Sequence, residues 1–132
     1  QRGVPALRSE DDVFTNHIHA DDLAHLVYAA LRRGRPNRCY NACDDSELKM
    51  GDYFDQVADA FSLPRPPRIA RATAEGALSA TQLSFMRESR RLDNRRLRRE
   101  LGVRLRYPQV ASGIAAARAE ACRQKMAEAM PQ

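Results

Sequence analysis

Apolar side chains recur at helical spacing in two separate segments of the chain. In residues 22–33 they stand at i, i+3, i+4, i+7 and i+8, at Leu23, Leu26, Val27, Ala30 and Leu31. This spacing places them on one face of a helix. Acidic residues open the segment and Arg32-Arg33-Gly34 close it, as the helix dipole and C-terminal capping favour. The pattern therefore predicts an amphipathic helix over residues 22–33.

A second helix is predicted by the apolar set Met50, Tyr53, Phe54, Val57, Ala58 and Phe61. It should stop before Pro64, because proline disfavours a helical conformation in the residue before it. Residues 38–43 and the neighbourhood of Ile69 are typical of short strands. Residues 74–85 are expected to be helical.

Towards the C-terminus, Asn94 should cap a short helix that turns Leu97 and Leu101 inward and is followed by Gly102. Pro108 should open an Ala-rich helix running to about Met126. Residues 1–15 show no period and are expected to be a loop or a severed connection. Helices interleaved with few short strands indicate an α/β protein, with too few strands to close a parallel sheet of its own.

Composition narrows the function classes. The 132 residues suit one domain, and 43% hydrophobic with 30% charged residues is ordinary for a globular protein. No apolar run has the length of a membrane span. Three cysteines in a loose arrangement do not suggest a disulfide framework, so we expect a cytoplasmic location. The net charge of +5 comes almost entirely from arginine and is weak evidence for nucleic acid. Because the chain lacks an initiator Met, we expect a fragment or a processed product.

The run from His17 to Asp22 supports two interpretations. In the first, His17 and His19, two residues apart, and the aspartates that follow them are residue types that bind metal ions. A metal site needs further ligands, however, and His25 is the sole other histidine. The favoured interpretation is that Asp21 or Asp22, Asp22 above all, accepts hydrogen bonds from the free N–H groups at the helix start while His19 bonds locally. We therefore expect no metal.

Several short motifs in order resemble one enzyme family. They are Ile18-His19-Ala20-Asp21-Asp22-Leu23-Ala24, Tyr40-Asn41-Ala42-Cys43-Asp44-Asp45, the segment from Met50 to Pro64, and the segment from Arg91 to Pro108. Together they resemble the C-terminal half of NAD-dependent epimerases and dehydratases, the extended short-chain dehydrogenase/reductases. The resemblance implies a helix-rich C-terminal fragment of a Rossmann-type enzyme, with residues 16–132 as the substrate-side domain.

The chain also departs from this family. It contains no Gly-x-x-Gly-x-x-Gly turn to approach a pyrophosphate and no Tyr-x-x-x-Lys, the family's acid/base pair. Thr15 stands where nucleotide-sugar members carry an arginine, which puts a nucleotide-sugar substrate in doubt. We therefore expect the intact parent protein to use NAD(P) and this chain alone to bind none.

The resemblance implies an oxidoreductase acting on a sugar-like or other small polar molecule. Its substrate contacts are expected at Asn16 and His17, and next at Thr15. The missing N-terminal dinucleotide-binding half is the expected partner. Without it, the helix faces carrying Leu26, Val27, Tyr53 or Val57 should drive self-association.

Two alternatives stay open. The chain could be a non-catalytic protein-interaction module, or a basic nucleic-acid-binding domain that uses the arginines between Arg87 and Arg106. The second is less favoured, because acidic residues interrupt the basic run and aromatic platforms for bases are few. Whether the chain is itself an enzyme is left open.

Overall fold

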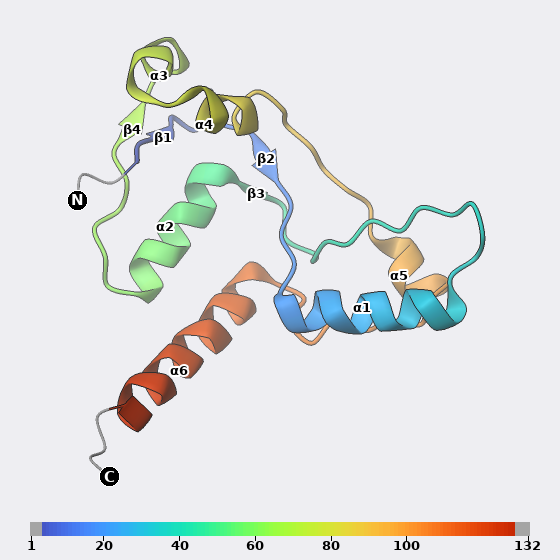
Figure 1. The fold of residues 1–132 in the computed structure, drawn as a ribbon. Coiled ribbons are helices and arrows are strands. Elements are labelled where there is room, and N and C mark those ends of the chain that lie inside the picture. Colours follow the sequence, from blue (N-terminus) through green and yellow to red (C-terminus); the bar gives the residue numbers. More distant parts are fainter. Residues whose placement is uncertain (1–3, 129–132) are drawn as a thin grey trace.

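The structure, a computed structural model, describes residues 4–128. Its helices are α1 (Ala20–Arg33), α2 (Met50–Ala60), α3 (Arg71–Ala77), α4 (Ala80–Phe85), α5 (Arg95–Arg99) and α6 (Val110–Glu128). Its strands are β1 (Ala6–Leu7), β2 (Phe14–Thr15), β3 (Leu48–Lys49) and β4 (Arg68–Ile69). Figure 1 shows α3 and α4 at one end of the molecule, α1 and α5 together to one side, and α6 projecting from the body. The fold is α/β, rich in helix and poor in strand.

The strands form two small sheets in the described part of the chain. In one, β1 and β4 run parallel, with Ala6 opposite Arg68; in the other, β2 and β3 run antiparallel, with Thr15 opposite Leu48. The expectation of a loop over residues 1–15 is thus wrong in part, because Ala6 and Leu7 are buried strand residues. The Arg68 guanidinium donates to the Leu7 carbonyl over 3.0 Å and to Asp55 over 2.7 Å, which attaches β1 and β4 to α2.

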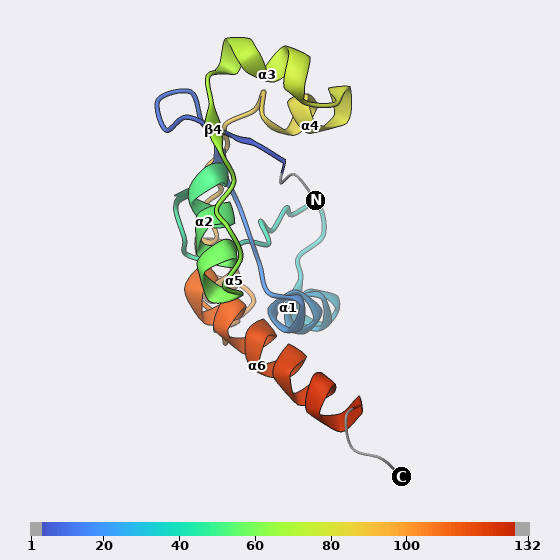
Figure 2. The same cartoon turned by 90° about the vertical axis from the view of Figure 1, so that its left-hand side faces the viewer.

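Two apolar clusters hold the elements together. The first packs Leu26 and Ala29 of α1 against Leu97, Leu101 and Val103 around α5. Both views show α5 beside α1. The second cluster joins residues of β1, α3 and the segment after α4, at Leu7, Ala74 and Met86. Figure 2 shows that α3 and α4 lie at the end of the molecule opposite α6.

Helix α1 confirms the predicted helix but buries a different side of it. The buried residues are Asp22, Leu26 and Ala29, whereas Leu23 and Val27 are exposed and Leu31 is 83% exposed. Most of the predicted apolar stripe therefore has no packing partner among residues 4–128. The helix ends at Gly34, where an added Cβ would lie 2.3 Å from the Ala30 carbonyl oxygen. Close backbone approach, rather than a positive φ, requires glycine there.

The strand predicted over residues 38–43 does not form, which corrects the sequence interpretation. A strand needs backbone hydrogen bonds to a neighbouring strand, and residues 38–43 make none with the other described residues. Side chains bind this segment instead: the Arg96 guanidinium donates to the Cys39 carbonyl over 2.9 Å, and the Asn94 amide donates to the Cys43 carbonyl over 2.8 Å. The segment has the composition of a strand, but side-chain hydrogen bonds, and not a paired strand, hold it in place.

The remaining helices follow the sequence with local differences. Helix α2 has the predicted extent, and β4 includes Ile69. The helix expected over residues 74–85 is two helices, because Ser79 and Gln82 form a capping box that starts α4 after extended Leu78. Asn94 precedes α5 but makes no side-chain cap. The cap there comes from Asp93, whose Oδ1 accepts a 2.8 Å hydrogen bond from the Arg95 N–H.

Two further expectations concern the C-terminal part. Gly102 has φ +61°, as its predicted place after a helix end requires, and Leu97 and Leu101 are buried as expected. Helix α6 begins at Val110, shortly after Pro108, and is described as far as Glu128. None of the described helices combines the length and apolarity needed to cross a membrane.

Candidate functional site

The start of α1 is fixed by His19 rather than by Asp22. His19 occupies the N-cap position, and its Nδ1 accepts a 3.2 Å hydrogen bond from the Asp21 N–H. The capping role predicted for Asp22 is therefore wrong. The helix begins at Ala20, so Asp22 already lies within the first turn, where its side chain can leave the helix axis and reach another segment.

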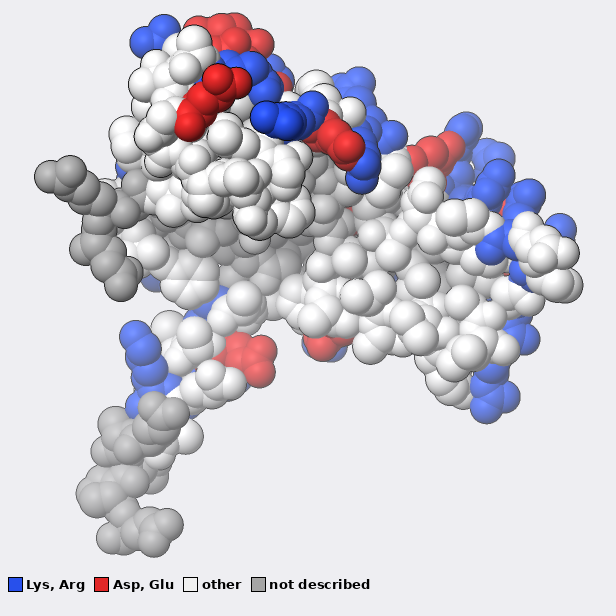
Figure 3. Space-filling view, turned by 45° about the horizontal axis from the view of Figure 1, so that its top comes forward, with Lys and Arg blue, Asp and Glu red and all other residues white. Residues whose placement is uncertain are grey.

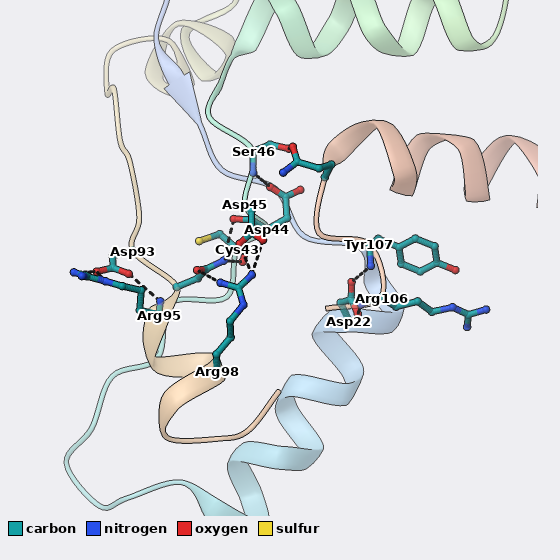
Figure 4. Close-up of polar contacts among 12 residues, drawn as sticks. Asp22, Cys43, Asp44, Asp45, Ser46, Asp93, Arg95, Arg98, Arg106 and Tyr107 are labelled. Atoms are coloured by element: carbon teal, nitrogen blue, oxygen red, sulfur yellow. Dashed lines mark hydrogen bonds and ion pairs between the residues drawn. The ribbon is translucent and has the colours of Figure 1, made fainter. Parts of the chain in front are cut away.

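Asp22 joins α1 to the connection before α6. Its carboxylate is 2% exposed and accepts two hydrogen bonds of 2.8 Å, from the backbone N–H groups of Arg106 and Tyr107 (Figure 4). The Tyr107 ring in turn packs on His19, with ring centroids 4.0 Å apart. This bond pair sets where α6 starts relative to α1.

His17, which lies shortly before α1, stacks against an aromatic ring of α2. Its imidazole stacks on Tyr53 of α2, with centroids 4.1 Å apart and planes 19° apart. Its Nε2 is covered from solvent and has no hydrogen-bond partner among the described residues. Burial lowers the pKa of His17, because the charged imidazolium is disfavoured away from water. Burial thus favours the neutral form of His17, whose Nε2 has no partner among the described residues.

The turn at residues 43–46 is held from α5. The Asn94 amide donates to the carbonyls of Cys43 and Asp44 and to Asp45 Oδ1. Arg98 also binds Asp45, over 2.7 Å to its Oδ1. The hydrogen bond from Arg98 is the main reason why the pKa of Asp45 lies below its usual value. Figure 4 shows the Asp45 side chain directed to Arg98 while the Asp44 side chain is directed to Ser46.

Unlike Asp22 and Asp45, the buried Asp44 side chain has few polar partners to stabilise its negative charge. It is 7% exposed, and its Oδ1 accepts a 2.9 Å hydrogen bond from the Ser46 N–H. No Lys or Arg within residues 4–128 forms an ion pair with it. Burial raises the pKa of the Asp44 carboxyl; hydrogen bonding to Ser46 offsets part of the rise, and the nearby charges of Asp45 and Asp22 add to it.

These groups surround one hollow, which we call the α1–α6 cavity. It has a volume of about 510 Å³ and lies between residues before α1, the turn at Asp44, α2 and the start of α6. Its lining comprises Asn16, His17, Ile18, His19, Ala20, Asp44, Tyr53, Tyr107, Gln109, Val110, Gly113, Ile114 and Ala117. Pockets of this size hold small organic molecules in many proteins.

The structure separates the predicted substrate residues. His17 lines the α1–α6 cavity, and Asn16 touches it and a second hollow of about 520 Å³ that also contains Thr15. The Asn16 amide is already occupied: it donates to the Arg90 carbonyl and accepts from the Leu92 N–H, both over 3.0 Å. Asn16 therefore positions the 90–92 segment.

Sequence reasoning missed Asp44, Tyr53 and Tyr107 as cavity residues. Asp44 was visible only as part of a family-like Asp-Asp motif, and nothing in that pattern shows which carboxylate is buried. The tyrosines come from elements far apart in sequence, so only the folded chain brings them to His17 and His19.

Metal and cysteine chemistry find little support in the geometry. His17 and His19 each pack on a different tyrosine, and the described residues hold no group of three His, Cys, Asp or Glu side chains placed to bind an ion. Cys43 is buried, and burial raises the pKa of its thiol, which disfavours the nucleophilic thiolate.

The start of α2 does not offer a free site for a dinucleotide phosphate. At the start of α2, the N–H groups of Met50 and Gly51 donate to the Val13 carbonyl and to Asp12. A Cβ at Gly51 would meet the Arg68 guanidinium, so this glycine makes room for an arginine side chain rather than for a phosphate.

Several of the arginines after residue 87 pair with acidic side chains of this chain. Arg91 binds Glu47 over 2.7 Å, Arg95 binds Asp93, Arg98 binds Asp45, and Arg90 pairs with Glu88. On the face drawn in Figure 3, blue and red side chains alternate along the upper rim, and blue predominates at the right-hand end. The alternating part is typical of a solvated surface with paired charges and not of a phosphate-binding one.

Two solved structures share this fold. A functionally unknown conserved protein from Silicibacter pomeroyi DSS matches with a TM-score of 0.76 and 35% identity, over 83% of this chain and 39% of that chain. The human epimerase family protein SDR39U1 (isoform 2), solved with NADPH, matches with a TM-score of 0.71 and 16% identity, over 89% of this chain and 39% of that one.

The chain thus spans 39% of the length of either protein. At 16% identity the likeness to SDR39U1 establishes the fold alone. No protein-family model matches the chain, and no curated protein does.

Proposed function

We propose that this chain is the substrate-side portion of an NAD(P)-dependent oxidoreductase of the epimerase/dehydratase type, acting on a sugar-like or other small polar molecule. The observation that carries the proposal is the likeness to SDR39U1, an epimerase family protein solved with NADPH, over 89% of this chain. The order of the motifs around Asp22, Asp45 and Arg91 supports the same family. It is a separate line of support, because it comes from the sequence and not from the fold comparison.

The proposal divides labour between two parts of one enzyme. The described residues offer no glycine turn for a pyrophosphate, and the N–H groups at the start of α2 are already bound. Dinucleotide binding and the acid/base pair are therefore assigned to a part outside this chain. Since fold analogy does not identify a reaction, epimerisation, dehydration and reduction stand as equal variants of the proposal.

Within this division, His17 is assigned to the substrate wall, because its ring lines the α1–α6 cavity. Asn16 is assigned a supporting role through its bonds to residues 90 and 92. Thr15 lines the second hollow beside Phe85 and Arg90, where it would meet a larger substrate or a neighbouring part of the enzyme.

The test is the complete gene. Its coding sequence upstream of Gln1 is expected to encode a Gly-x-x-Gly-x-x-Gly turn and a Tyr-x-x-x-Lys pair. A purified product of that gene should bind NADPH or NADH, and replacing the pair's tyrosine by phenylalanine should abolish turnover of carbonyl substrates with little loss of dinucleotide binding. An upstream region that encodes neither motif would refute the proposal.

A non-catalytic interaction module is a second candidate, favoured by the uncovered side of α1. Leu23, Val27, Tyr28 and Leu31 are all exposed large side chains on that helix. Exposed apolar patches on a globular domain commonly mark contact with another protein or domain. The same gene reading separates the candidates, because a complete short gene without the two motifs would favour the module.

A further inference from the structure

Three aspartates approach one another beside the α1–α6 cavity, and only one of them lacks strong partners. Asp22 accepts two backbone hydrogen bonds, and Asp45 binds Arg98 and Asn94. Asp44 accepts one hydrogen bond, from the Ser46 N–H, although it is 7% exposed. Asp44 also lines the cavity, which the other two aspartates do not.

A buried carboxylate without a cation is costly, because the negative charge loses its hydration. Proteins avoid this cost unless another requirement holds the group in place. Here the turn that carries Asp44 is fixed by the Asn94 amide through the Cys43 and Asp44 carbonyls. The turn is thus fixed through its backbone by Asn94, and the Asp44 carboxylate stands at the cavity wall with the Ser46 N–H as its hydrogen-bond donor.

The rest of the cavity lining is aromatic or apolar and could pack against the flat face of a small ring. The His17–Tyr53 stack and the His19–Tyr107 pair supply aromatic surface on two sides. Helix α6 supplies a third side through small or apolar residues at Val110, Gly113 and Ala117. Apolar faces with a few fixed polar groups are typical of sites that bind small polar molecules.

Charge selects among such molecules. No lysine or arginine lines the cavity, and Asp44, which has no ion-pair partner among residues 4–128, is the acidic residue in its lining. A phosphate or carboxylate would be repelled there, whereas a hydroxyl or ammonium group could donate a hydrogen bond to the carboxylate. We propose that the α1–α6 cavity binds an unphosphorylated polyhydroxyl compound, with the Asp44 carboxylate accepting hydrogen bonds from its hydroxyl or amino groups.

This inference deepens the proposed function, on which it rests for the view that the cavity is a substrate site. Binding in the cavity needs no dinucleotide, so it is tested on this chain alone. A failure here would leave the reading of the complete gene unaffected, and a gene without the expected motifs would leave a measured sugar site unaffected.

The probes are glucose, glucosamine and glucose 6-phosphate, titrated into the ¹⁵N-labelled chain and followed by amide chemical shifts. Glucose and glucosamine are expected to shift amides in residues 16–20, 44–46 and 107–117 in a saturable way, with glucosamine binding more tightly. Glucose 6-phosphate should bind at least about tenfold more weakly than glucose, which corresponds to about 1.4 kcal/mol. Equal or tighter binding of the phosphate, shifts confined to other residues, or no saturable shift with any probe would overturn the proposal.

Two variants with matched controls assign the binding to the cavity. Asp44→Asn keeps the acceptor for the Ser46 N–H but removes the charge, and should remove the preference for glucosamine over glucose. Its control is Asp21→Asn, whose side chain is 62% exposed. Ala117→Leu should block the cavity. Ala115→Leu should not, because Ala115, also exposed on α6, lines a separate hollow between α2 and α6. Binding that survives Ala117→Leu, or a preference for glucosamine that survives Asp44→Asn, would refute the assignment.

Discussion

The Asp22 carboxylate accepts a 2.8 Å hydrogen bond from the backbone N–H of Tyr107, 85 residues later in the chain. A second bond of 2.8 Å comes from the Arg106 N–H. Because Tyr107 leads directly into α6, this pair of bonds fixes two walls of the α1–α6 cavity against each other. The first turn of α1 thus determines the shape of a site to which Asp22 itself does not contribute a lining atom.

Replacing Asp22 by alanine should destabilise the fold by about 2–4 kcal/mol, because it leaves two backbone N–H groups without their acceptor. The measurement is the free energy of unfolding in urea. Asp21→Ala removes an exposed carboxylate from the same turn and should cost about 0.5 kcal/mol or less. Equal effects of the two substitutions would show that the Asp22 bonds contribute nothing specific.

Elements whose stability comes from local pattern and nearby packing were predictable. The apolar spacing of α2 and the inward Leu97 and Leu101 of α5 are visible in sequence and are present in the structure. Features that depend on a partner far away in the sequence were not predictable. Residues 38–43 have strand character but lack a paired backbone among residues 4–128, and α1 buries Asp22 where its pattern predicted Leu23 and Val27.

The candidate site divides in the same way. His17 could be chosen from its motif, and it does line the cavity. Asn16 was expected to contact substrate, but its amide is bound to residues 90 and 92, 74 or more positions away. Asp44 could not be singled out, because its burial depends on Asn94 and on the placement of α6, and no local pattern encodes either.

Asp44→Asn should stabilise the protein at neutral pH by about 0.5–2 kcal/mol, a usual gain when an unfavourable group is removed. Burial raises the pKa of Asp44 in the folded state. Its contribution to stability is therefore present below the pKa of the unfolded chain and is lost as pH rises through the folded pKa. The advantage of the variant should shrink as pH falls to about 4, and unfolding curves at several pH values would check this. An unchanged or lower stability at pH 7 would show that Asp44 has a structural partner.

His17 should make the fold less stable on acidification. Burial lowers its pKa, so its contribution to stability is present above the unfolded value of about 6.5 and is lost as pH falls through the folded pKa. His17→Phe retains a ring to stack on Tyr53 and removes the unpartnered Nε2. Between pH 7.5 and 5 the variant should lose less stability than the parent, and His25→Phe, at an exposed position, serves as the control. Identical pH profiles of the parent and His17→Phe would contradict this role.

The exposed side of α1 should drive self-association. Leu31 is 83% exposed and Val27 is 50% exposed, whereas Leu26, also expected to contribute, is buried in the core and unavailable. Sedimentation velocity over a wide concentration range should show a dimer or larger assembly. Val27→Gln with Leu31→Gln should weaken it at least about tenfold, equivalent to about 1.4 kcal/mol. Leu63→Gln, at another exposed leucine, should not. A strictly monomeric parent chain would refute the prediction.

The proposed division of labour is tested most directly by calorimetric titration of NADPH into two proteins, this chain and the product of the complete gene. The account predicts no measurable binding to this chain, because its described residues offer no glycine-lined turn and the N–H groups at the start of α2 are bound to Asp12 and Val13. It predicts micromolar binding to the complete product. Micromolar binding to this chain, or none to the complete product, would contradict it.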